Sequence, residues 1–140
     1  MKIINRFEAT VKRQPNALAV IDNDGEVTFQ RLRQKALIIG SAVKERLGGR
    51  INQPVSIFLS ERADYVAAIL GILYSGNFYV PLIKNGAKRL LKTVVATIKP
   101  EVIITDYDSA GGLVQCAIQV SRQLVIDEVF EQGLQQPVNV

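Results

Sequence analysis

Short apolar segments rich in β-branched residues alternate along this chain with longer segments whose apolar residues recur every three or four positions. The short segments are apolar at nearly every position, which is typical of strands that are covered on both faces of a sheet. Helical segments between them are the usual connections of parallel strands. The order therefore predicts an α/β fold with three layers, a mostly parallel sheet flanked by helices. The predicted strands are residues 55–59, 78–80, 102–105 and 124–127.

The predicted helices begin and end at residues that suit those places. Pro15 follows the first helix, and Thr28 is a suitable N-cap for the second. Gly48 and Gly49 follow the second helix, as is typical of a C-cap. The spacing predicts two further helices, over residues 62–74, which is apolar enough to be buried on more than one side, and over residues 87–98.

An antiparallel hairpin is predicted near the N-terminus. Residues 18–22 and 26–28 are its strands, and Asn23-Asp24-Gly25 is its turn, because Asp-Gly tolerates the positive φ that such turns need. The hairpin could add an antiparallel edge to the sheet. The chain has 140 residues, which fits a single unit over residues 1–140. The Gln-rich, polar residues 131–140 are expected to fray.

Composition excludes several kinds of site. The chain has no His, the commonest general base and metal ligand, and one Cys, which cannot build a disulfide framework. We therefore expect no metal site. The chain carries 17 Lys+Arg against 13 Asp+Glu. The first residues contain no apolar signal segment and no stretch suits a membrane span, so a cytoplasmic protein without membrane contact is expected.

The densest basic stretch contains Lys84, Lys88, Arg89 and Lys92 without an aromatic residue among them. Such a stretch is typical of the solvated face of a helix. Elsewhere, acidic residues interleave with the basic ones over much of the chain. We therefore expect no nucleic acid as a partner.

Two partial motifs each lack a residue that their chemistry needs. Gly71 and Gly76 have the spacing of a phosphate loop, but Asn77 follows where Lys is required, so a packing role is predicted. Asp106 and Asp108 begin a pattern like a calcium loop, but too few oxygen ligands follow, and a turn is predicted instead. The Gly48-Gly49 and Gly111-Gly112 pairs lack dinucleotide-binding spacing.

Cys116 and Asp106 are the remaining candidates for a site. Cys116 could be a nucleophile, but activation needs a base, and a small buried side chain is the favoured interpretation. Asp106 follows a predicted parallel strand, where α/β sites form, and it is the best candidate on geometry. A capping role in its loop is favoured over a site role, because Asp readily bonds backbone in turns. The residues alone predict no catalytic, cofactor-binding or metal-binding set.

Four short motifs match a known pattern in order. They are F-x-x-x-V-x-x-x-P-x-x-x-A-V, met by Phe7, Val11, Pro15, Ala19 and Val20; D-x-x-G-x-x-T-Y-x-E-L, met by Asp22, Gly25, Thr28, Phe29 and Leu32; L-K-A-G-x-A-Y-V-P-L-D, to which residues 73–82 are close; and a following helix and strand, which residues 89–90 and 100–106 resemble. The chain resembles the N-terminal region of the amino-acid adenylation domain of nonribosomal peptide synthetases, which are adenylate-forming enzymes of the AMP-dependent synthetase and ligase superfamily. The 76–82 segment is the most specific part of the match. Arg31 and Ile83 depart from the pattern, where the family has acidic residues.

The resemblance implies an enzyme that joins an amino-acid carboxylate to AMP, using ATP and magnesium. The acyl group would then pass to a phosphopantetheine thiol on a carrier domain. In the family, the phosphate loop, the nucleotide and amino-acid contacts and the catalytic Lys lie downstream of the matched region. No residue here therefore inherits a catalytic, cofactor-binding or metal-binding role. We expect a first subdomain that is inactive alone, with the rest of the adenylation domain and the carrier domain as its partners.

Two alternatives stay open from the sequence. One is a stand-alone structural or interaction module that forms a homodimer or complements a missing remainder. Its contact surface would be the apolar Tyr65–Tyr74 helix and any open sheet edge. The other is a small nucleotide-binding α/β domain, which the fold class permits although no motif supports it.

Overall fold

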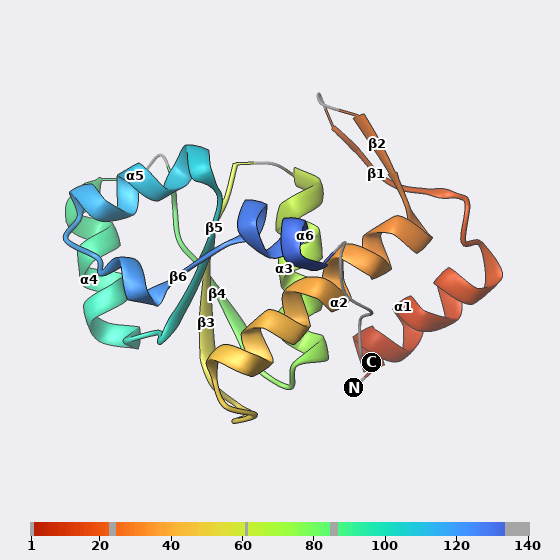
Figure 1. Cartoon of the computed structure of the whole chain (residues 1–140), viewed down its shortest axis with the longest axis horizontal. Coiled ribbons are helices and arrows are strands. Elements are labelled where there is room, and N and C mark those ends of the chain that lie inside the picture. Colours follow the sequence, from red (N-terminus) through yellow and green to blue (C-terminus); the bar gives the residue numbers. More distant parts are fainter. Residues whose placement is uncertain (1, 23–24, 61, 85–86, 134–140) are drawn as a thin grey trace.

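A four-stranded parallel sheet stands between two layers of helices (Figure 1). The computed structural model describes residues 2–22, 25–60, 62–84 and 87–133. In chain order, the elements are α1 (Lys2–Arg13), β1 (Leu18–Asp22), β2 (Gly25–Thr28), α2 (Phe29–Arg46), β3 (Pro54–Phe58), α3 (Arg62–Tyr74), β4 (Phe78–Pro81), α4 (Lys88–Ile98), β5 (Val102–Thr105), α5 (Tyr107–Gln115), a 3-10 turn (Val120–Arg122), β6 (Gln123–Val125) and α6 (Ile126–Gly133).

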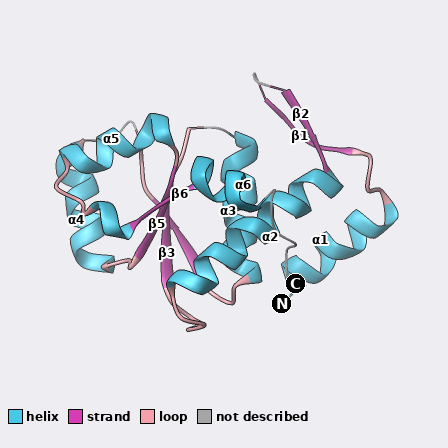
Figure 2. Cartoon of the chain, in the orientation of Figure 1, coloured by secondary structure: helices cyan, strands magenta, loops and turns pink. Residues whose placement is uncertain are grey.

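The strand order in the sheet is β4-β3-β5-β6, and neighbouring strands are parallel. Figure 2 shows these strands in magenta, with helices in cyan on both sides of them. Alternate side chains of β3 and β5 enter two separate apolar cores, because successive residues of a strand point to opposite faces. Ile57 and Ile104 lie in the core beneath α2 and α3. Phe58 and Ile103 lie in the other core, with residues of α4 and α5. The predicted three-layer α/β fold is confirmed.

The hairpin β1-β2 forms a separate two-stranded sheet and does not extend the parallel one. It is attached through Val20, which is buried in the core of α2 and α3, and through Asp22, whose Oδ2 accepts a hydrogen bond from the Ala63 backbone N–H at 3.3 Å. The predicted hairpin strands are confirmed. The turn residues Asn23 and Asp24 lie outside the described residues.

Helix α2 begins and ends where the sequence predicts. Thr28 Oγ1 accepts a hydrogen bond from the Arg31 backbone N–H at 3.2 Å, so Thr28 is the N-cap. Gly48 and Gly49 follow the helix with φ of +61° and +81°, a region that favours glycine. Helix α3 is covered by α2 and the sheet, and none of its described side chains is exposed. The burial of α3 on more than one side, which the sequence predicts, leaves only partly buried apolar side chains for the contact surface expected on this helix.

Two predictions for the C-terminal third are wrong. The segment that begins with Asp106 and Asp108, interpreted as a turn, forms α5 over residues 107–115, although Gly111 and Gly112 lower its helix propensity. The last strand ends at Val125, not at Asp127, because Ile126 and Asp127 begin α6. Helix α6 continues to Gly133 and so includes residues 131–133 of the tail that is expected to fray over residues 131–140. Residues 134–140 lie outside the described residues. Over the described ranges, no helix has the length and apolar character that crossing a membrane requires.

Candidate functional site

Polar residues follow three neighbouring strands at the carboxyl edge of the sheet, the edge at which parallel strands end. Ser60 lies after β3, Asp106 directly after β5, and Asp127 in the first turn of α6 after β6. Ligand sites of α/β proteins form at this edge. The side chain predicted as the best candidate, Asp106, is thus the center of the candidate site.

Asp106 is 6% exposed, and both of its carboxylate oxygens are engaged. Oδ1 accepts a hydrogen bond from the Ser109 backbone N–H at 2.8 Å, and Oδ2 accepts one from Ser60 Oγ at 3.2 Å. Asp106 is therefore the N-cap of α5. Burial raises the pKa of Asp106, but these hydrogen bonds outweigh burial and hold the pKa below its ordinary value. The capping interpretation is confirmed.

Two further polar side chains at this edge, those of Asp127 and Thr105, also bind the protein's own backbone. Asp127 Oδ1 accepts a hydrogen bond from the Tyr107 N–H at 3.1 Å, and Thr105 Oγ1 donates one to the Phe58 carbonyl at 2.9 Å. These hydrogen bonds connect α5 to α6 and β5 to β3. Sequence reasoning missed Ser60 and Ser109 as partners of Asp106. The Ser109 bond comes from the backbone N–H of the third helical residue, so an Asp directly before a helix is its signal, whereas no local pattern indicates Ser60.

Gly71 and Gly76 pack and turn the chain and do not form a phosphate loop. A Cβ on Gly71 would lie 2.7 Å from the Ala36 carbonyl oxygen, because α2 and α3 approach closely there. Gly76 ends α3 with φ of +81°. The buried Asn77 follows, and its Oδ1 accepts a hydrogen bond from the Gln53 backbone N–H at 2.9 Å. The segment is a junction between α3 and β4, as the packing interpretation predicts.

Cys116 is 5% exposed and lies in the core between α4 and α5. It caps the C-terminus of α5, whereas Asp106 caps the N-terminus, so the structure does not bring the two candidates together. Cys116 also lines a hollow of about 350 Å³, whose basic residues are Lys92, Lys99 and Arg122. Within the described ranges, no group of three or more Cys, Asp or Glu side chains is placed to hold a metal ion.

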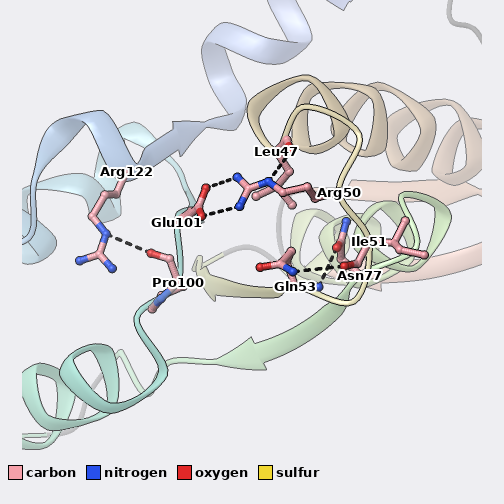
Figure 3. A network of polar contacts seen from close by, with 8 residues as sticks. All are labelled: Leu47, Arg50, Ile51, Gln53, Asn77, Pro100, Glu101 and Arg122. Atoms are coloured by element: carbon pink, nitrogen blue, oxygen red, sulfur yellow. Dashed lines mark hydrogen bonds and ion pairs between the residues drawn. The ribbon is translucent and has the colours of Figure 1, made fainter.

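At the opposite, amino edge of the sheet, polar contacts tie loops together (Figure 3). Arg50 donates two hydrogen bonds to the Glu101 carboxylate, of which the one from Nη1 to Oε1 measures 2.8 Å. Its Nε donates to the Leu47 carbonyl at 2.9 Å. Arg122 Nε donates to the Pro100 carbonyl at 3.0 Å. These contacts join the loop after α2 to the start of β5 and the turn before β6. They are structural links between elements.

A family model described as "AMP-binding enzyme" matches residues 7–138. Among curated proteins, the chain is 30% identical over 112 residues to the hybrid PKS-NRPS synthetase tasS of Hapsidospora irregularis, covering 78% of the chain and 3% of that protein. It is 29% identical over 114 residues to bacitracin synthase 1 of Bacillus licheniformis, covering 81% of the chain and 2% of that protein. The chain thus spans a small fraction of these relatives.

Solved structures share the fold. The nonribosomal peptide synthetase FmoA3 bound to alpha-methyl-L-serine-AMP superposes with a TM-score of 0.82 at 24% identity, over 98% of this chain and 15% of that one. The anthranilate CoA ligase AuaEII, in complex with anthranoyl-AMP, superposes with a TM-score of 0.82 at 19% identity, over 98% of this chain and 28% of that one. At these identities, the likeness establishes the three-layer fold.

Proposed function

The chain belongs to the family of AMP-binding enzymes, and we propose that it forms the first subdomain of an amino-acid adenylation domain of the nonribosomal peptide synthetase type. The family match over residues 7–138 is the observation that carries this proposal. The peptide synthetases among the relatives and the FmoA3 structure support it. The parent enzyme would act in the cytoplasm, in keeping with a single Cys.

The parent domain would join an amino-acid carboxylate to the α-phosphate of ATP, releasing pyrophosphate, and would transfer the acyl group to a phosphopantetheine thiol. Its partners would be the rest of the adenylation domain and a carrier domain. This chain would supply scaffold to that reaction. In this proposal, none of its residues has a catalytic, cofactor-binding or metal-binding role.

We propose that the chain is inactive by itself. Asp106, the best-placed carboxylate, is already bound by Ser60 and Ser109. The described residues contain no group of three or more carboxylates placed to hold a metal ion, and we assign no metal-dependent step to them. A phosphate cradle needs backbone N–H groups and a cation aimed at the polyphosphate. At the carboxyl edge, the Tyr107 and Ser109 N–H groups are occupied by Asp127 and Asp106.

Amino-acid-dependent exchange of labelled pyrophosphate into ATP tests this proposal. We expect the purified chain to give no exchange above a no-enzyme blank with any amino acid. An intact adenylation domain serves as the positive control under the same conditions. Exchange by the chain that depends on one amino acid would show that it is a catalyst in its own right and would contradict the proposal.

A second candidate function, an interaction module that self-associates, is favoured by one observation. In edge strand β4, Phe78 is 48% and Tyr79 is 42% exposed. An edge strand with exposed large apolar side chains is a surface for pairing with another chain. This candidate is compatible with the first, because an inactive subdomain can also associate.

A further inference from the structure

A small apolar hollow lies between the end of β4 and helix α4. Its volume is about 60 Å³, and its lining side chains are all apolar. Of the lining residues, Leu82 and Leu91 are buried, whereas Ile83 and Leu90 are 63% and 48% exposed. Since one water needs roughly 10–15 Å³ of such space, the hollow accepts about four to six heavy atoms, enough for one leucine side chain. Pockets for cofactors and drug-sized ligands are several times larger, at roughly 300–1,000 Å³.

The surface around this hollow is basic. Lys84 follows Ile83 directly, and Lys88 and Arg89 lie in the first turn of α4, beside the lining residues Ala87 and Leu90. All three cations are exposed, and no ion pair of the described residues includes them. No Asp or Glu occurs between Asp64 and Glu101. The local charge is therefore not compensated by neighbours in sequence.

The start of α4 is also mismatched with its own charges. Ala87 occupies the N-cap position and supplies no side-chain hydrogen bond, and the first turn contains no acidic residue. The N-terminus of a helix carries partial positive charge, so Lys88 and Arg89 in the first turn are unfavourable there. A carboxylate brought by another molecule would relieve this repulsion.

We propose that the hollow and the start of α4 bind an acidic amphipathic helix of a partner protein. One aliphatic side chain of the partner enters the hollow between Leu82 and Leu91, and its flanking carboxylates face Lys84, Lys88 and Arg89. Helices bind apolar grooves through such anchor side chains, and complementary charge selects the partner. The size of the hollow favours this occupant over a small-molecule ligand.

The test uses two fluorescein-labelled peptides of about 18 residues, long enough to form a helix. Both carry Leu at every third or fourth position, and the other positions are mostly Glu in one and Lys in the other. Fluorescence anisotropy with the whole chain is expected to show binding of the Glu peptide, at least about tenfold tighter than the Lys peptide and weakened by salt. The Leu90→Asp variant should weaken Glu-peptide binding about tenfold or more, as loss of an anchor contact does.

Matched variants separate this surface from general effects. Lys88→Glu/Arg89→Glu should weaken the Glu peptide about tenfold and remove most of its salt dependence, whereas Lys12→Glu/Lys44→Glu, with the same change in charge on exposed helix positions, should not. Val120→Asp is the control for Leu90→Asp, because the Val120 side chain is 69% exposed and lies away from the hollow. Circular dichroism verifies that each variant is folded.

Equal binding of both peptides, no binding, or unchanged binding by Leu90→Asp overturns the proposal. A dimer that Leu90→Asp dissociates overturns it in favour of a second copy.

Discussion

Asp106 illustrates how one carboxylate at a site-forming edge can serve the fold instead of chemistry. It accepts one hydrogen bond from the backbone N–H of Ser109, which is 3 residues away in sequence, and one from Oγ of Ser60, which is 46 residues away. The bond to Ser109 caps α5, and the bond to Ser60 fixes the segment after β3. Removal of Asp106 is therefore expected to affect folding rather than a ligand.

The Asp106→Ala variant should be destabilised by about 1–2 kcal/mol, because it loses the N-cap and leaves its donors without an acceptor. Urea denaturation followed by circular dichroism measures this change. Asp106→Asn keeps an oxygen that can accept the Ser109 bond, so we expect a smaller loss. An unchanged midpoint in Asp106→Ala would show that the cap contributes nothing.

The same carboxylate predicts a pH dependence. The pKa of Asp106 is lower in the folded chain than in the unfolded chain. Between these two pKa values, the unfolded chain therefore binds more protons than the folded chain. The stabilisation is present above the unfolded pKa, at about pH 4, and is lost as the pH falls through the folded pKa. The difference in unfolding free energy between the wild type and Asp106→Asn should narrow below about pH 4. A difference that is constant from pH 6 to pH 2 would rule out this linkage.

Gly71 shows a different constraint, close approach of two backbones. A Cβ there would lie 2.7 Å from the Ala36 carbonyl oxygen and 3.0 Å from the Gly40 nitrogen. Gly71→Ala should therefore be destabilised by about 1–3 kcal/mol, the usual effect of overpacking. Gly111 in α5 has no atom within 4 Å of the same position and is the matched control. Gly111→Ala should be neutral or more stable by about 0.5–1 kcal/mol, and thermal unfolding compares the two.

At the scale of elements, α1 is held against α2 and α3 by a mixed aromatic and charged cluster. The Phe7 ring centroid lies 6.4 Å from those of both Phe29 and Tyr74. Glu8 Oε1 accepts hydrogen bonds from Arg33 Nε at 2.7 Å and from the Tyr74 hydroxyl. Burial raises the pKa of Tyr74 and the hydrogen bond to Glu8 raises it further, so the phenol keeps its proton and remains a donor.

Glu8→Gln should loosen α1 without unfolding the rest of the chain. The variant removes the charge from both hydrogen bonds, and because the Glu8 side chain is 38% exposed we expect a loss of only about 0.5–1 kcal/mol. Hydrogen exchange should quicken in the amides of α1 and stay unchanged in β3 and β5. Lys12→Gln, an exposed position on the same helix, is the control. Uniformly faster exchange would mean that Glu8 stabilises the whole domain.

At the scale of the whole molecule, the sheet separates two apolar cores. Of its two edge strands, β4 and β6, it is β4 that carries exposed apolar side chains. If the chain self-associates, this edge is the contact. Sedimentation should then show a dimer that Tyr79→Lys converts to a monomer, because a Lys on an edge strand opposes pairing. A dimer that persists in Tyr79→Lys would place the contact elsewhere. A wild-type chain that stays monomeric over a wide range of concentration would exclude self-association.

By itself, the sequence determined the local structure and the layered class of this protein. Apolar periodicity, the Thr28 cap and the glycines after α2 depend on neighbouring residues, and each appears in the fold as predicted. Helix α5 escaped prediction because its two glycines disfavour a helix, which tertiary packing of Leu113 and Cys116 overrides.

Only the tertiary structure decided the strand order, the separation of the hairpin from the main sheet, and the bond between Asp106 and Ser60. The reason is that each depends on partners distant in the chain, such as Ser60 for Asp106, and a local pattern does not specify which distant groups meet.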